Sequence, residues 1–186
     1  AYLGSTSICS NQFTDISTLG NCDHEEADTR IFTHVNHCLM SGSSKITIRT
    51  GDTDVLVLAV SACAQLDIPE LWLAFGTGKN FRYIAAHKIS KSMENSRSLA
   101  LPVFHSLTGC DTVSSFAGKG KKTAWSVWNS FPQLTKALIT IANDPSQHSS
   151  PDIFSIIQQF IVLLYDRTSD ICTVNEARRR LFPLKN

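Results

Sequence analysis

The chain has 186 residues, a formal net charge of +1 and 42% hydrophobic residues. This length and apolar content suit one domain with its own core, or one domain with a helical extension. The near-neutral charge excludes a protein that is basic over its whole surface, although it permits local basic patches. The six cysteines are scattered, unlike those of a small disulfide scaffold, and no membrane-spanning or signal-peptide pattern is present, so we expect an intracellular protein.

Strands and helices are predicted to mix in the first part of the chain. Residues 1–22 are polar and weakly patterned and form a lead-in, and a helix begins near Asp23, where acidic residues suit a helix start. Residues 41–44 are small and polar and end that helix. The elements that follow are a strand at 45–50, a helix at 54–65, a strand at 71–75, a turn at 76–80 and a strand at 81–85 in a hairpin with the second.

The rest of the chain is predicted to be mainly helical. Residues 89–107 form a helix that is interrupted at Pro102, residues 109–111 form a sharp turn, and a glycine- and lysine-containing loop at 114–122 follows. The last helices are expected at residues 123–130, 132–141, 151–165 and 174–181. Strands mixed with helices, followed by helices alone, predict an α/β core with a helical C-terminal part.

Two aspartates stand at the end of the predicted strand at 45–50. Gly51 separates this strand from Asp52 and Asp54, and the apolar run at 55–60 follows them. Ligands of open α/β sheets bind at the carboxyl ends of strands, so the pair is a candidate metal site. Asp is also a favoured N-cap and suits the first turn of a helix, so the pair is equally a candidate helix cap.

Further charged residues could belong to a metal site, or could serve as helix caps and turn residues. Glu26 and Asp28 lie at the start of the first helix, and Asp111 follows the turn at Gly109 and Cys110. Sites for two hard cations gather carboxylate oxygens from several elements. The glycine-rich loop carries three lysines that favour phosphate contact, with a solvated turn as the alternative: Lys119, Lys121 and Lys122.

Other groups carry weaker signals. A zinc site is disfavoured because its candidate ligands lack regular spacing: Cys22, His24, His34, His37 and Cys38. Trp125 and Trp128 are expected in the core rather than as platforms for nucleic-acid bases. His105 is expected to be a packed side chain, and residues 178–180 a solvated arginine face of the last helix.

Three stretches of the sequence carry a resemblance to a known superfamily. They are HEEADT at residues 24–29, TGDTDV at 50–55, and LTGCD at 107–111 followed by GKGKK at 118–122. In their order and spacing they resemble the internal region of flap endonucleases and the wider PIN-like nuclease superfamily. The resemblance covers residues 24 to 136. It implies a three-layer α/β core with a mainly parallel sheet at 23–122 and a helical part at 123–186.

The resemblance also implies site residues and an activity. The implied ligands of Mg²⁺ or Mn²⁺ are Glu26, Asp28, Asp52, Asp54 and Asp111. The implied catalytic residues are Asp52, Asp54 and Asp111, and the implied contacts to the backbone of DNA or RNA are Lys119, Lys121 and Lys122. The implied reaction is phosphodiester hydrolysis by a metal-activated water. The alternatives are a catalytically inactive domain that binds nucleic acid or protein, and a structural domain in which the acids are caps and turns.

A second resemblance extends over nearly the whole chain. Four stretches of the chain resemble a multi-copy group of animal proteins linked to mobile elements. They are HEEADTRI, DTDVLVL, FHSLTGCDTVSSFAGKGK and VNEARRRLF. This resemblance implies a nuclease-like fold, and we expect a nuclear protein without a membrane partner. PIN-like nucleases place one more metal-binding Asp on a first strand, whereas Asp15 has no apolar strand before it. We therefore expect that an upstream segment, or that ligand, is missing.

Overall fold

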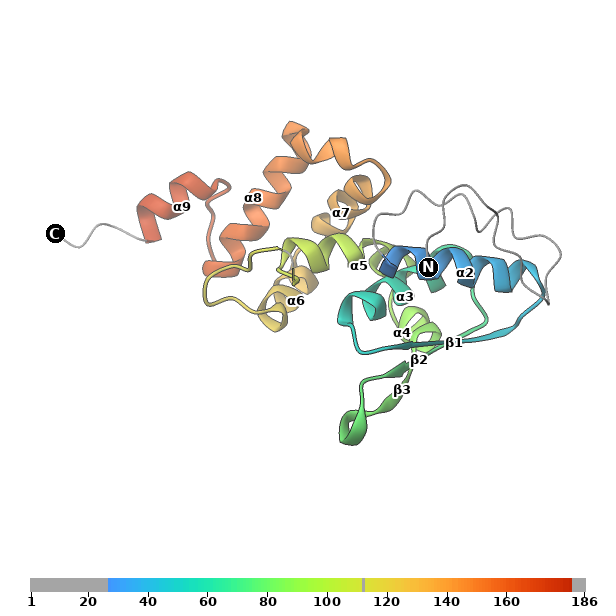
Figure 1. Cartoon of the computed structure of the whole chain (residues 1–186). Helices are drawn as coiled ribbons and strands as arrows, with labels where there is room; N and C mark the ends of the chain where they lie inside the picture. Colours follow the sequence, from blue (N-terminus) through green and yellow to red (C-terminus); the bar gives the residue numbers. More distant parts are fainter. Residues whose placement is uncertain (1–26, 112, 182–186) are drawn as a thin grey trace, which may run out of the picture. The chain divides into compact units, whose positions relative to one another are not determined.

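The computed structural model of the chain describes residues 27–111 and 113–181 (Figure 1). These residues form two compact units, the first ending at Ile89 and the second beginning at Ser90. Strands and helices mix in the first unit, whereas the named elements of the second are all helices. The structure therefore confirms an α/β protein whose later part is helical. The domain boundaries drawn from the sequence, after residues 22 and 122, stay predictions.

The first unit is built around a small sheet with strand order β1-β2-β3. Its elements are α2 (Ala27–Met40), β1 (Lys45–Thr50), α3 (Thr53–Leu66), β2 (Glu70–Phe75), the 3₁₀ turn η1 (Gly78–Asn80), β3 (Arg82–Ala85) and the start of α4 (Ala86–Ser92). β1 pairs with β2 in parallel and β2 pairs with β3 antiparallel. Among the described residues the sheet is therefore mixed, rather than mainly parallel, because a tight connection through η1 can join only antiparallel neighbours.

Helix α3 explains why the apolar run after Asp54 is not a strand. Its buried residues recur at helical spacing, at Val55, Ala59, Val60, Ala62 and Cys63. A strand would bury every second residue instead. α3 packs against α2 and β2, and Leu71 and Leu73 of β2 are fully buried. The predicted helix at 54–65 and the predicted strands at 45–50, 71–75 and 81–85 are thus confirmed within a residue or so at each end.

The second unit has a helical core. Its elements are α5 (Asn95–Leu107), α6 (Lys121–Ser130), α7 (Gln133–Asn143), the 3₁₀ turn η2 (Pro145–Ser149), α8 (Pro151–Tyr165) and α9 (Val174–Leu181). Phe104 stacks on Trp128 with ring centroids 4.4 Å apart, and Phe160 packs into the same cluster. Trp128 is fully buried and its indole N–H donates to Thr135 Oγ1 at 2.9 Å, which confirms its place in the core.

The predicted interruption of the helix at Pro102 is wrong. α5 runs through Pro102 without a break, and the helical segment is divided instead at residues 93–94, between α4 and α5. An internal proline costs a helix about 3 kcal/mol because a hydrogen bond is lost. Ala100 and Phe104 are buried on either side of Pro102 in the core of the second unit, and this packing outweighs the local cost.

Candidate functional site

Asp52 is the N-cap of α3. Its backbone is extended, and its Oδ1 accepts a hydrogen bond from the N–H of Asp54 at 2.8 Å. The N–H of Asp52 in turn donates to Thr50 Oγ1 at 3.0 Å, so the last residue of β1 holds the cap in position. Asp54 lies in the first turn of α3, where the positive end of the helix dipole favours a carboxylate. Both acids are half-buried, and the capping role that the sequence allowed is present.

Topology brings a third predicted carboxylate to the same end of the sheet. α2 and α3 are each joined to β1 by a short connection, so both run antiparallel to β1 and begin beside its carboxyl end (Figure 1). The two helices pack against each other. Asp28 lies in the first turn of α2, and therefore at the same edge as Asp52 and Asp54. This edge is where parallel strands of α/β proteins present ligand sites.

The carboxyl end of β2 adjoins this edge through Gly76. The N–H of Gly76 donates to the carbonyl of Thr50 at 3.0 Å, which ties the ends of β1 and β2 together. Gly76 has φ +79°, and a Cβ there would lie 2.9 Å from the carbonyl oxygen of Asn80, so the turn requires glycine. The sequence marked residues 76–80 only as a turn. Their position beside Asp52 follows from the parallel pairing of β1 and β2, which the sequence did not specify.

The predicted metal ligands are not all assembled by the described residues. Glu26 lies outside them, and Asp111 lies in the second unit, in an exposed turn closed by the N–H of Val113 and the carbonyl of Cys110 at 3.1 Å. In the described ranges, no three His, Cys, Asp or Glu side chains are grouped to hold a metal. The carboxylates at the edge of β1 are the hard oxygen donors that Mg²⁺ and Mn²⁺ take, and the five-residue ligand set stays a prediction.

Lys121, predicted to hold a phosphate backbone, contacts the end of α5. Its ammonium donates to the carbonyl of His105 at 2.9 Å, to Thr108 Oγ1 at 3.2 Å and to the carbonyl of Gly109. The last carbonyls of a helix have no partner within the helix, and a cation there is favoured by the helix dipole. Lys121 is therefore a structural cap of α5 in this conformation.

The other two lysines of the loop, Lys119 and Lys122, differ in their contacts and in their exposure to solvent. The Lys119 ammonium lies 5.3 Å from the centre of the Tyr165 ring, and this side chain is half-buried. Lys122 is exposed at the start of α6. Of the three predicted phosphate contacts, Lys122 is thus the most accessible, and phosphate binding by the loop stays a prediction.

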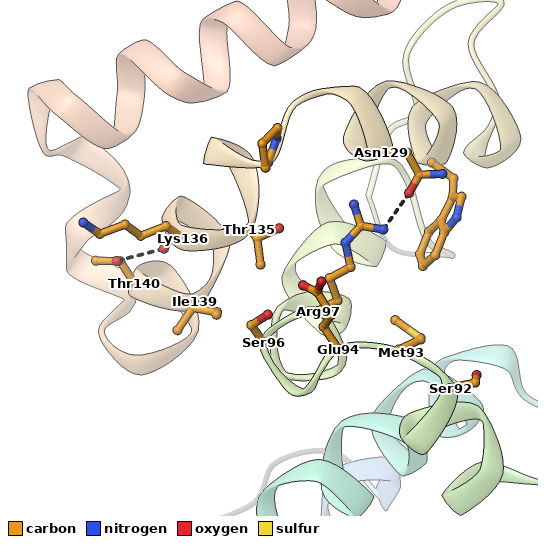
Figure 2. A pocket seen from close by; sticks show the side chains of 12 residues that line it. Ser92, Met93, Glu94, Ser96, Arg97, Asn129, Thr135, Lys136, Ile139 and Thr140 are labelled. Atoms are coloured by element: carbon orange, nitrogen blue, oxygen red, sulfur yellow. Dashed lines mark hydrogen bonds between the residues drawn. The ribbon is translucent and has the colours of Figure 1, made fainter.

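A pocket of about 930 Å³ opens in the second unit where α5 begins (Figure 2). Arg97 donates from Nη1 to Asn129 Oδ1 at 2.6 Å and from Nη2 to the carbonyl of Trp128 at 3.3 Å, and Figure 2 shows the Arg97 and Asn129 side chains pointing toward each other. The ionisable residues of the lining are Glu94, Arg97 and Lys136. Its lining residues come from α4, α5, α6 and α7 and from the segments between them, and they carried no local signal in the sequence.

Comparison with protein-family models, curated protein sequences and solved structures gave no significant match. Within the described ranges, every helix is too short or too polar to cross a bilayer. The function is therefore inferred from the residues of this chain and their arrangement.

Proposed function

We propose that this chain is a PIN-like, flap-endonuclease-like domain that hydrolyses phosphodiester bonds in DNA or RNA. The observation that supports the proposal best is the position of Asp52 and Asp54 directly after the carboxyl end of β1, with Asp28 in the first turn of the neighbouring helix α2. Three carboxylates from two helix starts at this edge match the position of ligand sites in α/β proteins. The full three-layer core and the remaining ligands, Glu26 and Asp111, belong to the proposal.

The carboxylates would hold Mg²⁺ or Mn²⁺. A bound divalent ion supplies activation of a water and stabilisation of the leaving oxygen in phosphodiester hydrolysis. The capping role of Asp52 is compatible with metal binding, because a carboxylate has about four lone-pair sites and the cap uses one. Lys119 and Lys122 would contact phosphates, and Lys121 would join them only by leaving the end of α5. We propose an intracellular, nuclear site of action for this activity.

A catalytically inactive domain that binds nucleic acid or protein is the second candidate. It is favoured by the hydrogen bonds that already engage Asp52 and Lys121 in capping helices. In such a domain the acids would serve as caps and turn residues, and the edge of β1 would need no metal. The two candidates differ in one measurable property, which is metal-dependent cleavage.

A cleavage assay on labelled single- and double-stranded DNA and RNA, with Mg²⁺, Mn²⁺ or EDTA, tests the proposal. Asp52→Asn removes the charge but keeps a side-chain oxygen that can cap α3, so the fold is preserved. We expect cleavage by the parent chain with metal only, and a loss of roughly 100-fold or more in Asp52→Asn, since several kcal/mol of charge stabilisation disappear. Asp152→Asn, at an exposed position in the first turn of α8, is the matched control and should retain parent activity.

Two results would overturn the proposal. A folded parent chain that cleaves none of these substrates with either metal ion is not a nuclease, and the inactive binding domain then remains. Cleavage at equal rates by the parent and Asp52→Asn shows that hydrolysis does not depend on this carboxylate, and the site at the end of β1 is then excluded.

A further inference from the structure

The sheet of the first unit has one apolar face and one partly exposed face. Strand alternation places Ile48, Leu71 and Leu73 on the apolar face, where all three are buried. The other face, here called the open sheet face, carries Lys45, Thr47, Arg49, Glu70, Trp72, Ala74, Tyr83 and Ala85. Lys45, Thr47, Arg49 and Tyr83 on it are exposed to solvent. An antiparallel edge strand such as β3 commonly has one wet face, but it seldom presents large aromatic rings there.

Aromatic rings dominate one end of the open sheet face. Tyr83 on β3 is 63% exposed, and Phe81, which precedes β3, is 39% exposed. Their ring centroids lie 5.3 Å apart with the rings nearly perpendicular, and the Arg49 guanidinium lies 6.0 Å from the centre of the Phe81 ring. The strand register places Arg49 and Tyr83 on either side of Ala74, in one row across the sheet. These neighbours leave more than half of the Tyr83 surface accessible.

The other end of the open sheet face is cationic. Trp72 is half-buried at the centre of the sheet, with the ammonium groups of Lys45 and Lys88 at 5.9 Å and 6.0 Å from its ring centre. His87 meets the edge of the same ring at a centroid distance of 5.3 Å. Two lysines and Arg49 thus surround the aromatic rings, an arrangement that favours a polyanion.

Glu70 is the acidic residue of the open sheet face, and it is already paired. Its carboxylate accepts a hydrogen bond from the Trp72 indole N–H at 3.2 Å and lies 3.7 Å from the Lys45 ammonium. The Trp72 hydrogen bond, followed by the charges of Lys45 and His87, lowers the pKa of Glu70 below its ordinary value. Because this carboxylate is held at the Lys45 end of the sheet, the row of Arg49 and Tyr83 keeps an excess of positive charge.

We propose that the open sheet face binds single-stranded nucleic acid, with bases stacking on Tyr83 and Phe81 and phosphates contacting Arg49, Lys45 and Lys88. Every base has a π-face, so exposed rings bind bases without sequence preference. The bases of a duplex are stacked on one another and cannot reach a flat sheet, so single strands are selected. This binding needs none of the carboxylates of the proposed metal site, and it therefore goes beyond hydrolysis.

Fluorescence anisotropy tests the proposal with a labelled oligothymidine of about 12 nucleotides, within the usual footprint of such surfaces, in EDTA. We expect Tyr83→Ala to weaken binding roughly 5- to 100-fold, which corresponds to the loss of one stacked base. Tyr83→Phe keeps the ring and should bind like the parent. Phe154→Ala removes an aromatic ring that is 54% exposed on α8, and this matched control should also bind like the parent.

Salt and competitors complete the test. The logarithm of the binding constant falls linearly with the logarithm of the salt concentration, and one phosphate contact on a single strand contributes roughly 0.7 to the slope. Arg49→Gln should therefore make this slope shallower by roughly 0.7. Parent-like binding by Tyr83→Ala, an equal loss in Phe154→Ala, or equal affinity for the matching duplex overturns the proposal. Displacement of the oligonucleotide by polyglutamate at equal charge concentration also overturns it, because the face would then be a general surface for acidic proteins.

The outcomes for this face and for the proposed nuclease activity are separable. If the parent chain binds the oligothymidine through Tyr83 but cleaves nothing with metal, this inference stands and the proposed function is wrong. If the parent chain cleaves with metal but the Tyr83→Ala variant binds normally in EDTA, the proposed function stands and this inference is wrong.

Discussion

At the scale of single residues, Asp52 shows why a metal ligand and a helix N-cap are difficult to distinguish from sequence. An acid between a strand and a helix suits both a metal and the unpaired N–H groups of the helix start. The hydrogen bond between Asp52 Oδ1 and the N–H of Asp54 establishes the capping role. It leaves the metal-binding role open, because the second carboxylate oxygen is not used in that bond.

The capping role predicts the order of stability of two variants. Asp52→Ala should lower the free energy of unfolding by about 0.5–2 kcal/mol, because the hydrogen bond to Asp54 is lost. Asp52→Asn should lower it much less, since asparagine is an equally good N-cap. Urea denaturation followed by circular dichroism measures both. Equal stability of the Ala variant and the parent would show that this hydrogen bond contributes nothing to the fold.

At the scale of elements, the junction between α5 and α6 depends on one long side chain. Gly109, with φ +97°, ends α5, and a Cβ there would lie 2.7 Å from the Cβ of Ser115. Lys121, the first residue of α6, then returns to the carbonyls of His105 and Gly109. The start of α6 is therefore tied to the end of α5 by the Lys121 side chain.

This contact of Lys121 predicts different effects for two adjacent lysines. Lys121→Met should lower the free energy of unfolding by about 0.5–1.5 kcal/mol, because several hydrogen bonds of a partly exposed ammonium are lost. Lys122→Met, the matched control at an exposed position, should change it by less than about 0.5 kcal/mol. Thermal denaturation of both variants provides the measurement. A larger loss in Lys122→Met than in Lys121→Met would contradict the assignment of the cap.

At the scale of the whole molecule, the predicted metal ligands are divided between two units. Asp28, Asp52 and Asp54 belong to the first, and Asp111 belongs to the second. The PIN-like proposal requires one ion, or one pair of ions, to be ligated by acids of both. An inactive binding domain has no such requirement, so the distribution of metal contacts distinguishes the two proposals.

Paramagnetic broadening in NMR spectra measures that distribution. With substoichiometric Mn²⁺, the proposal predicts broadening of the amide signals of Asp28, Asp52, Asp54 and Asp111 together, while those around Asp152 on α8 stay sharp. Mg²⁺ in excess should restore the signals by displacing Mn²⁺ from the shared site. Broadening confined to residues of one unit would contradict a metal site that includes Asp111.

Much of the secondary structure could be predicted from local patterns. The alternation in residues 45–50 and the helical periodicity of 151–165 and 174–181 predicted β1, α8 and α9 within their observed bounds. The continuity of α5 through Pro102 could not be predicted, because Ala100 and Phe104 pack against helices that are distant in the sequence. Of the candidate site, the sequence identified the acids and the lysine loop, but it left the capping and metal-binding roles of Asp52 unresolved.

By itself, the sequence determined most of the strands and helices, because periodicity and capping act over a few residues. Only the tertiary structure decided the roles of particular side chains. Lys121 contacts a carbonyl 16 positions earlier, and the open sheet face places Arg49 and Tyr83 in one row through the pairing of three strands. Such contacts join residues far apart in the chain, so they depend on strand register and helix packing, which no short window of sequence contains.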